Sequence, residues 1–173
     1  MTDPSSPSSG PLSRPSLGNP AVLLATVFGI GLLPKAPGTW ASLAALPAGW
    51  WIMAAGGMPA LGAAILAVFV IGVWACSGYE KATGHHDAGA CVIDEVAGQW
   101  IVLLITPPDP LFYAGAFLLF RFFDIVKPWP TGWADETVHG GIGVMLDDVF
   151  AGLQGATVMA LTMAGLTALG VWP

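Results

Sequence analysis

Acidic residues occur as adjacent pairs at two places in a chain that is otherwise poor in charge. Only 9% of its 173 residues are Asp, Glu, Lys or Arg, yet Asp94-Glu95 and Asp147-Asp148 each lie next to an apolar run. Adjacent carboxylates repel each other unless a cation lies between them, and oxygen ligands without a Cys/His set favour Mg²⁺ or Mn²⁺. A solvated helix start, where the helix dipole favours acids, is the alternative for either pair alone. Together the two pairs predict a divalent metal site.

A second concentration of charge surrounds the later acid pair, in the stretch 121–148. Arg121, Asp124 and Lys127 are spaced three apart, so on a helix they would project from one side. Arg121 and Lys127 could neutralise a phosphate, and Asp124 could be a further metal ligand or their counter-ion. Ionisable groups this close to long apolar segments are costly unless they serve a polar site, which favours a functional site over a solvated loop at the membrane boundary.

Two further groups of residues could contribute to phosphate chemistry. The loop Lys35-Ala-Pro-Gly-Thr39, with Ser42, offers a cation, hydroxyls and backbone amides before a helix start, which suits a phosphate oxygen, although a plain turn fits equally well. His86 or His139 could protonate a leaving alkoxide near neutral pH. The whole set favours phosphoryl transfer, in which Mg²⁺ polarises the phosphorus–oxygen bonds and a carboxylate orients a water for in-line attack.

Several other phosphatase chemistries lack their signatures in this chain. No Cys has an Arg six positions later, no Asp-x-Asp occurs, and Pro-Ser-Gly-His is absent. A water nucleophile is therefore the simplest option, while a covalent phospho-aspartate stays open.

The composition is that of an integral membrane protein. Hydrophobic residues make up 55% of the chain, the mean hydropathy is +0.72, and 23 Gly and 8 Trp suit close helix packing and interfacial anchoring. The net charge of -6, without any basic stripe, argues against nucleic acid as a partner. Cys76 and Cys91 are too few for a zinc cluster, and both fall near the predicted reducing face, so we expect no disulfide.

The apolar runs predict an all-α, polytopic membrane bundle with about four to five membrane helices. Residues 1–19 are rich in Pro and Ser and are predicted to be disordered, which leaves 20–173 as one membrane-embedded domain. All five Lys and Arg would fall on one side of the membrane, which the positive-inside rule makes cytoplasmic. The expected elements are a short interfacial or re-entrant helix over 20–33, a hairpin of 40–55 and 59–76, and helices over 96–106, 111–126 and 149–171.

Four blocks of sequence together carry a family resemblance. They are GIGLLPKAPGTWASLAALP (29–47), HDAGACVIDEVAGQW (86–100), FRFFDIVKPWP (120–130) and VHGGIGVMLDDVFAG (138–152). In this order they resemble phosphatidylglycerophosphatase A, a family of Mg²⁺-dependent bacterial membrane phosphatases; Ala41 departs from the family, which more often has Gly there. The resemblance implies hydrolysis of phosphatidylglycerophosphate to phosphatidylglycerol and phosphate, the last step of phosphatidylglycerol synthesis, at a cytoplasm-facing site of the inner membrane.

The resemblance also implies a set of shared polar side chains. They are Thr39, Ser42, His86, Asp87, Asp94, Glu95, Arg121, Asp124, Lys127, His139, Asp147 and Asp148. From charge and spacing we expect Asp94, Glu95, Asp147 and Asp148 to bind the metal, with Asp124 as a further candidate and His86 or His139 as the acid. The expected phosphate contacts are Lys35, Thr39, Ser42, Arg121 and Lys127. The rival hypothesis is a small cation or proton transporter, although no acid lies in the middle of an apolar run. No protein partner is inferred.

Overall fold

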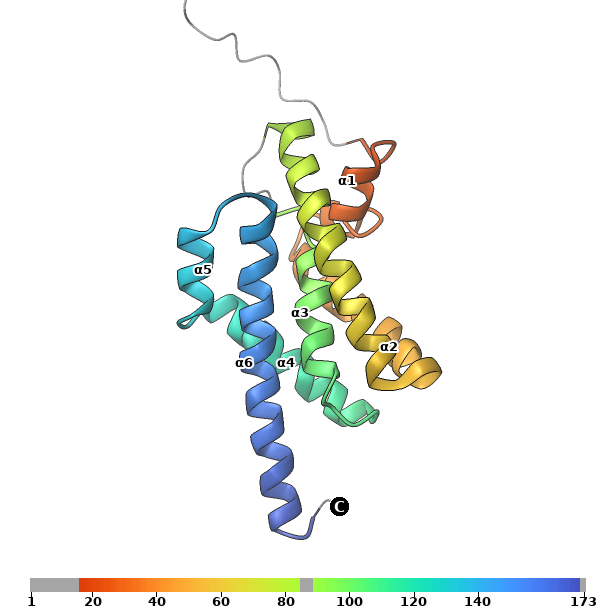
Figure 1. Cartoon of the computed structure of the whole chain (residues 1–173), viewed down its shortest axis with the longest axis vertical. Helices are drawn as coiled ribbons and strands as arrows, with labels where there is room; N and C mark the ends of the chain where they lie inside the picture. The colour runs from red at the N-terminus through yellow and green to blue at the C-terminus, as the bar shows by residue number, and fades with distance from the viewer. Residues whose placement is uncertain (1–15, 85–88, 172–173) are drawn as a thin grey trace, which may run out of the picture.

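Every regular element of the described chain is a helix. Residues 16–84 and 89–171 are described in the computed structural model (Figure 1). Among them lie α1 (Pro20–Ala25), a 3-10 turn η1 (Ile30–Leu32), α2 (Pro37–Thr83), α3 (Ile93–Leu103), α4 (Pro110–Val126), α5 (Thr131–Thr137) and α6 (Gly140–Ala168). The all-helical prediction is confirmed, and the expected disordered tail lies mostly outside the described residues.

Helix α2 consists of two helical halves that meet at Gly57. This residue has φ 65° and ψ -164°, a non-helical conformation that glycine adopts without a steric penalty. Pro59 follows, and proline is tolerated at the beginning of a helical segment because its missing N–H has no partner there anyway. In Figure 1 the first half is drawn in orange and the second runs from yellow to green. The break agrees with the helical hairpin that the sequence predicts.

The starts of α1 and α4 are set by the same local chemistry. Asn19 accepts a hydrogen bond from the N–H of Ala21 at 2.9 Å, and Asp109 accepts one from the N–H of Leu111 at 2.8 Å. In each case a proline follows the capping residue and opens the helix.

Helix α6 begins nine residues before the expected start at 149, so that expectation is wrong. Glycines of α6 let neighbouring helices approach it closely. A Cβ on Gly141 would collide with the carbonyl oxygen of Val73 on α2, and a Cβ on Gly152 would lie 2.6 Å from the carbonyl oxygen of Gly98 on α3. This close backbone packing is the physical reason that the glycine-rich stretch is helical.

Two apolar clusters hold α3 among α2, α4 and α6. The larger one includes Leu61, Trp100, Leu103, Phe120 and Met159, all of them buried. The indole N–H of Trp100 also donates to a backbone carbonyl of α2 at 2.8 Å. A second cluster, which includes Val22, Tyr79 and Met145, packs α1 against the second half of α2 and the start of α6.

Two helices, α2 and α6, are long and apolar enough to cross a membrane by length and composition. The 11-residue α3 and the 17-residue α4 are shorter than the roughly 20 residues that a bilayer-spanning helix needs. The structure therefore supports membrane association, while the expected four to five crossings are not confirmed.

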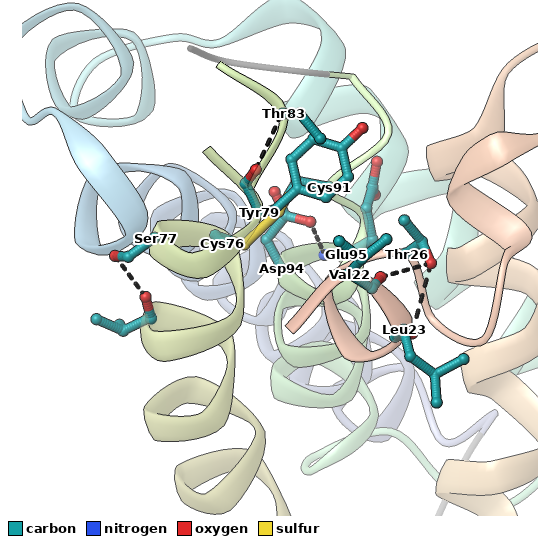
Figure 2. Close-up of a disulfide and its surroundings, with 11 residues drawn as sticks. Val22, Leu23, Thr26, Cys76, Ser77, Tyr79, Thr83, Cys91, Asp94 and Glu95 are labelled. Carbon is teal, nitrogen blue, oxygen red and sulfur yellow. Dashed lines mark hydrogen bonds between the residues drawn. A yellow bond between two sulfur atoms is a disulfide. The ribbon is translucent and has the colours of Figure 1, made fainter. Parts of the chain in front are cut away.

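The expectation that no disulfide forms is wrong. Cys76 on α2 is bonded to Cys91, two residues before α3, with their Cα atoms 6.1 Å apart (Figure 2). The N–H of Val92 donates to the carbonyl oxygen of Ala25 at 2.8 Å, which joins the end of α1 to the same place. Sequence reasoning relied on the redox compartment, whereas the fold places the second half of α2 directly beside the start of α3.

Candidate active site

A cavity of about 480 Å³ lies where α2, α3, α4, α5 and α6 meet. Its lining contains seven carboxylates from five helices, so both acid pairs and acids of the stretch 121–148 lie around one cavity. The seven are Glu80 on α2, Asp94 and Glu95 on α3, Asp124 on α4, Asp135 on α5, and Asp147 and Asp148 on α6.

Glu95 is fixed against the first half of α2. The hydroxyl of Ser42 donates to its Oε2 at 2.8 Å, and Arg121 forms an ion pair with the same oxygen. A Cβ on Gly38 would collide with the Glu95 carboxylate, so glycine is required there for α2 to approach α3. Ser42 therefore orients a site carboxylate, which differs from its expected contact with a phosphate.

Arg121, on α4, forms ion pairs with one acid on α3 and one acid on its own helix. Besides Glu95, its guanidinium pairs with Asp124 at 2.7 Å, which confirms that residues three apart on α4 share a side. Burial and the nearby Asp124 raise the pKa of the Glu95 carboxyl, and the ion pair with Arg121 partly offsets this rise. The guanidinium thus compensates charge in a part of the site that is largely shielded from solvent.

Lys127 plays the corresponding part on the other side of the cavity. Its Nζ lies 2.5 Å from Asp135 Oδ1 and 3.0 Å from Asp147 Oδ2. Burial alone would lower the pKa of Lys127, but these two carboxylates outweigh it and raise the pKa. Sequence reasoning missed Asp135, which is within the charged stretch, because α5 follows a turn whose direction the sequence does not indicate.

Three carboxylates form a compact cluster that could hold a metal ion. One oxygen from each of Glu95, Asp124 and Asp148 lies within 4.8 Å of the others, and Asp148 is only 2% exposed. The cluster consists of the second acid of each pair and of Asp124, whose role the sequence left open.

The first acid of each pair has a different environment. Asp94 and Asp147 each accept a hydrogen bond, at 2.9 Å, from the backbone N–H of the residue that follows. Burial, followed by the neighbouring carboxylates of Glu95 and Asp147, raises the pKa of Asp94 well above its usual range. Arg121 and Lys127 form ion pairs with four of these carboxylates, so the ionised carboxylates around the cavity outnumber these two cations. This excess favours binding of an additional cation.

The remaining predicted residues divide into three groups. His139, directly before α6, is exposed and lines the cavity. Lys35 is exposed, Thr39 is half-buried, and neither lines the cavity. His86 and its neighbour Asp87 lie outside the described residues. Sequence reasoning also missed Glu80, which lines the cavity from the second half of α2.

The fold and the site define a membrane-associated helical protein with a carboxylate-rich cavity at a helix junction. The sequence profile described as phosphatidylglycerophosphatase A matches residues 23–163. The chain belongs to the phosphatidylglycerophosphatase A family.

Three relatives illustrate this membership. The chain is 42% identical to phosphatidylglycerophosphatase A of Escherichia coli K12 over 148 residues, which cover 85% of the chain and 86% of the relative. It is 40% identical to the protein of the same name from Haemophilus influenzae, covering 86% and 92%. It is also 39% identical to a putative phosphatidylinositol-3-phosphatase of Bacteroides thetaiotaomicron, covering 81% and 91%. No solved structure gives a significant match.

Proposed function

We propose that this chain hydrolyses phosphatidylglycerophosphate to phosphatidylglycerol and inorganic phosphate, the last step of phosphatidylglycerol synthesis. Membership of the phosphatidylglycerophosphatase A family is the observation that carries the proposal. The cavity supports it, because Lys127, a cation for a phosphate, and carboxylates for a metal converge there. The comparisons give no support to the rival transporter hypothesis.

The metal in this proposal is Mg²⁺, held by Glu95, Asp124 and Asp148. Their oxygens suit a hard divalent cation, and a thiolate or imidazole set of the kind that zinc prefers does not occur in this cluster. When bound, Mg²⁺ supplies polarisation of the phosphorus–oxygen bonds and lowers the pKa of a coordinated water. The buried Asp148 carboxylate, close to the carboxylates of Glu95 and Asp124, fits a role as a ligand.

The other residues of the cavity bind the phosphate and move protons. Arg121 and Lys127 donate to the phosphate oxygens; the side chain of Lys127 is 32% exposed and can reach a ligand in the cavity. Asp94 and Asp147 orient the attacking water and accept its proton. As the new bond from water oxygen to phosphorus forms, the bond from phosphorus to the glycerol oxygen breaks. His139 protonates that oxygen, so phosphatidylglycerol leaves as a neutral alcohol.

We further propose that the site faces the cytoplasm at the inner membrane of a bacterium. The two apolar helices support a membrane location. Lys81, in the last turn of α2, and the cavity cations Arg121 and Lys127 lie in segments that meet the same cavity, and positive charge is the usual mark of cytoplasmic segments.

The test is phosphate release from phosphatidylglycerophosphate in mixed detergent micelles, with Mg²⁺, with EDTA, and with Mg²⁺ restored after EDTA. We expect release that stops with EDTA and returns with Mg²⁺. Phosphatidylinositol 3-phosphate serves as the comparison substrate, because one relative is named for that lipid. Faster release from the inositol lipid would overturn the substrate assignment, and release that persists in EDTA would overturn the metal assignment.

A further inference from the structure

A second, apolar depression lies between the first half of α2 and the beginning of α4. This groove has a volume of about 330 Å³ and is lined by Leu46, Pro47, Trp50, Pro110 and Tyr113. The rings of Trp50 and Tyr113 meet edge to face, with their centroids 5.0 Å apart. Trp50 is 37% exposed and Tyr113 is 4% exposed, so the groove has an open wall and a buried floor.

The groove is formed by α2 and α4, which also contribute residues to the candidate active site. Along each helix it lies equally far from the residue that contacts Glu95. On α2, Ser42 contacts Glu95, and Trp50 follows eight residues later, an axial rise of about 12 Å. On α4, Arg121 contacts the same carboxylate, and Tyr113 precedes it by eight residues, again about 12 Å. Ser42 and Arg121 both contact Glu95, and the rings of Trp50 and Tyr113 contact each other. The groove therefore lies next to the active site, about 12 Å farther along α2 and α4.

We propose that this groove binds an acyl chain of the lipid whose phosphate is hydrolysed, an inference that rests on the proposed function. The substrate of that reaction is a diacyl lipid, and its chains must leave the polar cavity along an apolar surface. The groove offers a concave apolar surface between α2 and α4, about 12 Å from Arg121 along α4. Aromatic and aliphatic walls with few polar atoms are what a hydrocarbon chain requires.

The hydroxyl of Tyr113 supplies an independent observation in favour of a lipid. It is buried and has no hydrogen-bond partner among the described residues. A buried hydroxyl without a partner is costly, and because Tyr113 lines the groove, a molecule bound there could supply the acceptor. The ester carbonyl at which an acyl chain begins is such an acceptor.

The groove determines which lipids bind, and it has no part in the chemical step. Its lining residues lie outside the carboxylate cavity, so their contacts with a chain are the same in the ground state and in the transition state. Contacts of this kind change KM and leave kcat unaltered.

The experiment compares dihexanoyl and dipalmitoyl phosphatidylglycerophosphate in the same mixed micelles. For Trp50→Ala we expect kcat/KM for the dipalmitoyl lipid to fall about tenfold through KM, a typical value for lost hydrocarbon contacts, and to fall about threefold or less for the dihexanoyl lipid, whose short chains make fewer contacts in the groove. Trp51→Ala is the matched control, because Trp51 is 72% exposed and does not line the groove. It should change neither value.

The ratio of kcat/KM for the dipalmitoyl lipid to kcat/KM for the dihexanoyl lipid tests the role of the groove. The activity of the unaltered chain on the dihexanoyl lipid tests the proposed function. An equal loss on both lipids in Trp50→Ala would show a role in packing alone and overturn the proposal. No loss on either lipid would show that ordinary membrane lipid or detergent covers the groove, and would also overturn it. Hydrolysis of neither lipid by the unaltered chain would remove the function and the groove's role together.

A second variant tests the hydroxyl alone. Tyr113→Phe keeps the ring contact and removes only the donor, so we expect KM to rise severalfold for the diester lipid and to stay constant for its diether analogue, which lacks the carbonyl. An equal effect on ester and ether would overturn the hydrogen bond to the ester.

Discussion

The two acid pairs are alike in sequence and differ in what surrounds them. Asp94 and Asp147, the first acids, both accept a hydrogen bond from the backbone N–H of the next residue at 2.9 Å. The second acids are unlike each other. Glu95 is bonded to Ser42 and to a guanidinium, whereas the Asp148 carboxylate is 2% exposed and has one oxygen within 4.8 Å of oxygens of Glu95 and Asp124.

This difference indicates which acid is compensated by a cation of the chain itself and which would gain most from a bound metal ion. In the α3 pair a cation from α4 compensates the buried second acid. In the α6 pair the cation, Lys127, is bonded to the first acid, and the second is left beside two other carboxylates. A buried carboxylate close to other carboxylates is costly, so we expect an added metal ion to contribute most at Asp148. Five substitutions test this comparison, in order of decreasing expected effect.

Asp148→Asn should have the largest effect on activity. It removes one of the three carboxylates that approach within 4.8 Å of one another, and we expect phosphate release to fall by about a thousandfold or more. The melting temperature in detergent should stay constant or rise, because the change removes a buried charge that repels its neighbours. Activity within tenfold of the unaltered chain would contradict the role of Asp148.

Arg121→Lys should lower activity by about a hundredfold, because a lysine ammonium is a point charge and cannot present a planar fork to two acids at once. The guanidinium now pairs with both Glu95 and Asp124. Steady-state kinetics should show a loss in both kcat and kcat/KM. A change in melting temperature without a kinetic change would mean that Arg121 is only structural.

Asp94→Asn and Asp147→Asn should each cost about ten- to a hundredfold, less than Asp148→Asn, because asparagine still accepts the backbone hydrogen bond that each acid now accepts. The two variants are measured side by side with Asp148→Asn in the same assay. If either first acid proves as important as Asp148, the distinction between first and second acids is wrong.

Asp135→Asn should have the smallest effect, less than about tenfold, because its ion pair with Lys127 is partly exposed and the same ammonium keeps its bond to Asp147. Raising the salt concentration with the unaltered chain should mimic the change, since salt screens exposed pairs. A loss as large as that of Asp147→Asn would place Asp135 among the residues that act on the substrate.

The helices that carry local signals could be predicted from sequence, and those that depend on packing could not. Asn19 and Asp109, each followed by proline, mark helix starts that hydropathy also indicates. The start of α6 carries no such signal. Its sequence is rich in glycine, which is typical of a loop, but Gly141 packs directly against the backbone of α2. The disulfide between Cys76 and Cys91 likewise depends on a helix contact that neither spacing nor compartment reveals.

The same division applies to the site. Its acids and Lys127 stood out because charge is rare in an apolar chain, and they do line one cavity. Their grouping depends on which side of each helix faces the cavity and on how deeply each residue lies along its helix. Asp124 therefore joins Glu95 and Asp148 instead of serving only Arg121, a distinction that single-sequence spacing does not contain.

The most direct test of this account is binding of Mn²⁺, as a spectroscopic substitute for Mg²⁺, to the purified chain in detergent, followed by electron paramagnetic resonance. The account predicts that the unaltered chain binds Mn²⁺, that Asp148→Asn weakens binding by about a hundredfold or more, and that Asp147→Asn weakens it by tenfold or less. Binding that survives Asp148→Asn but is lost in Asp147→Asn would contradict the assignment of the metal to Glu95, Asp124 and Asp148.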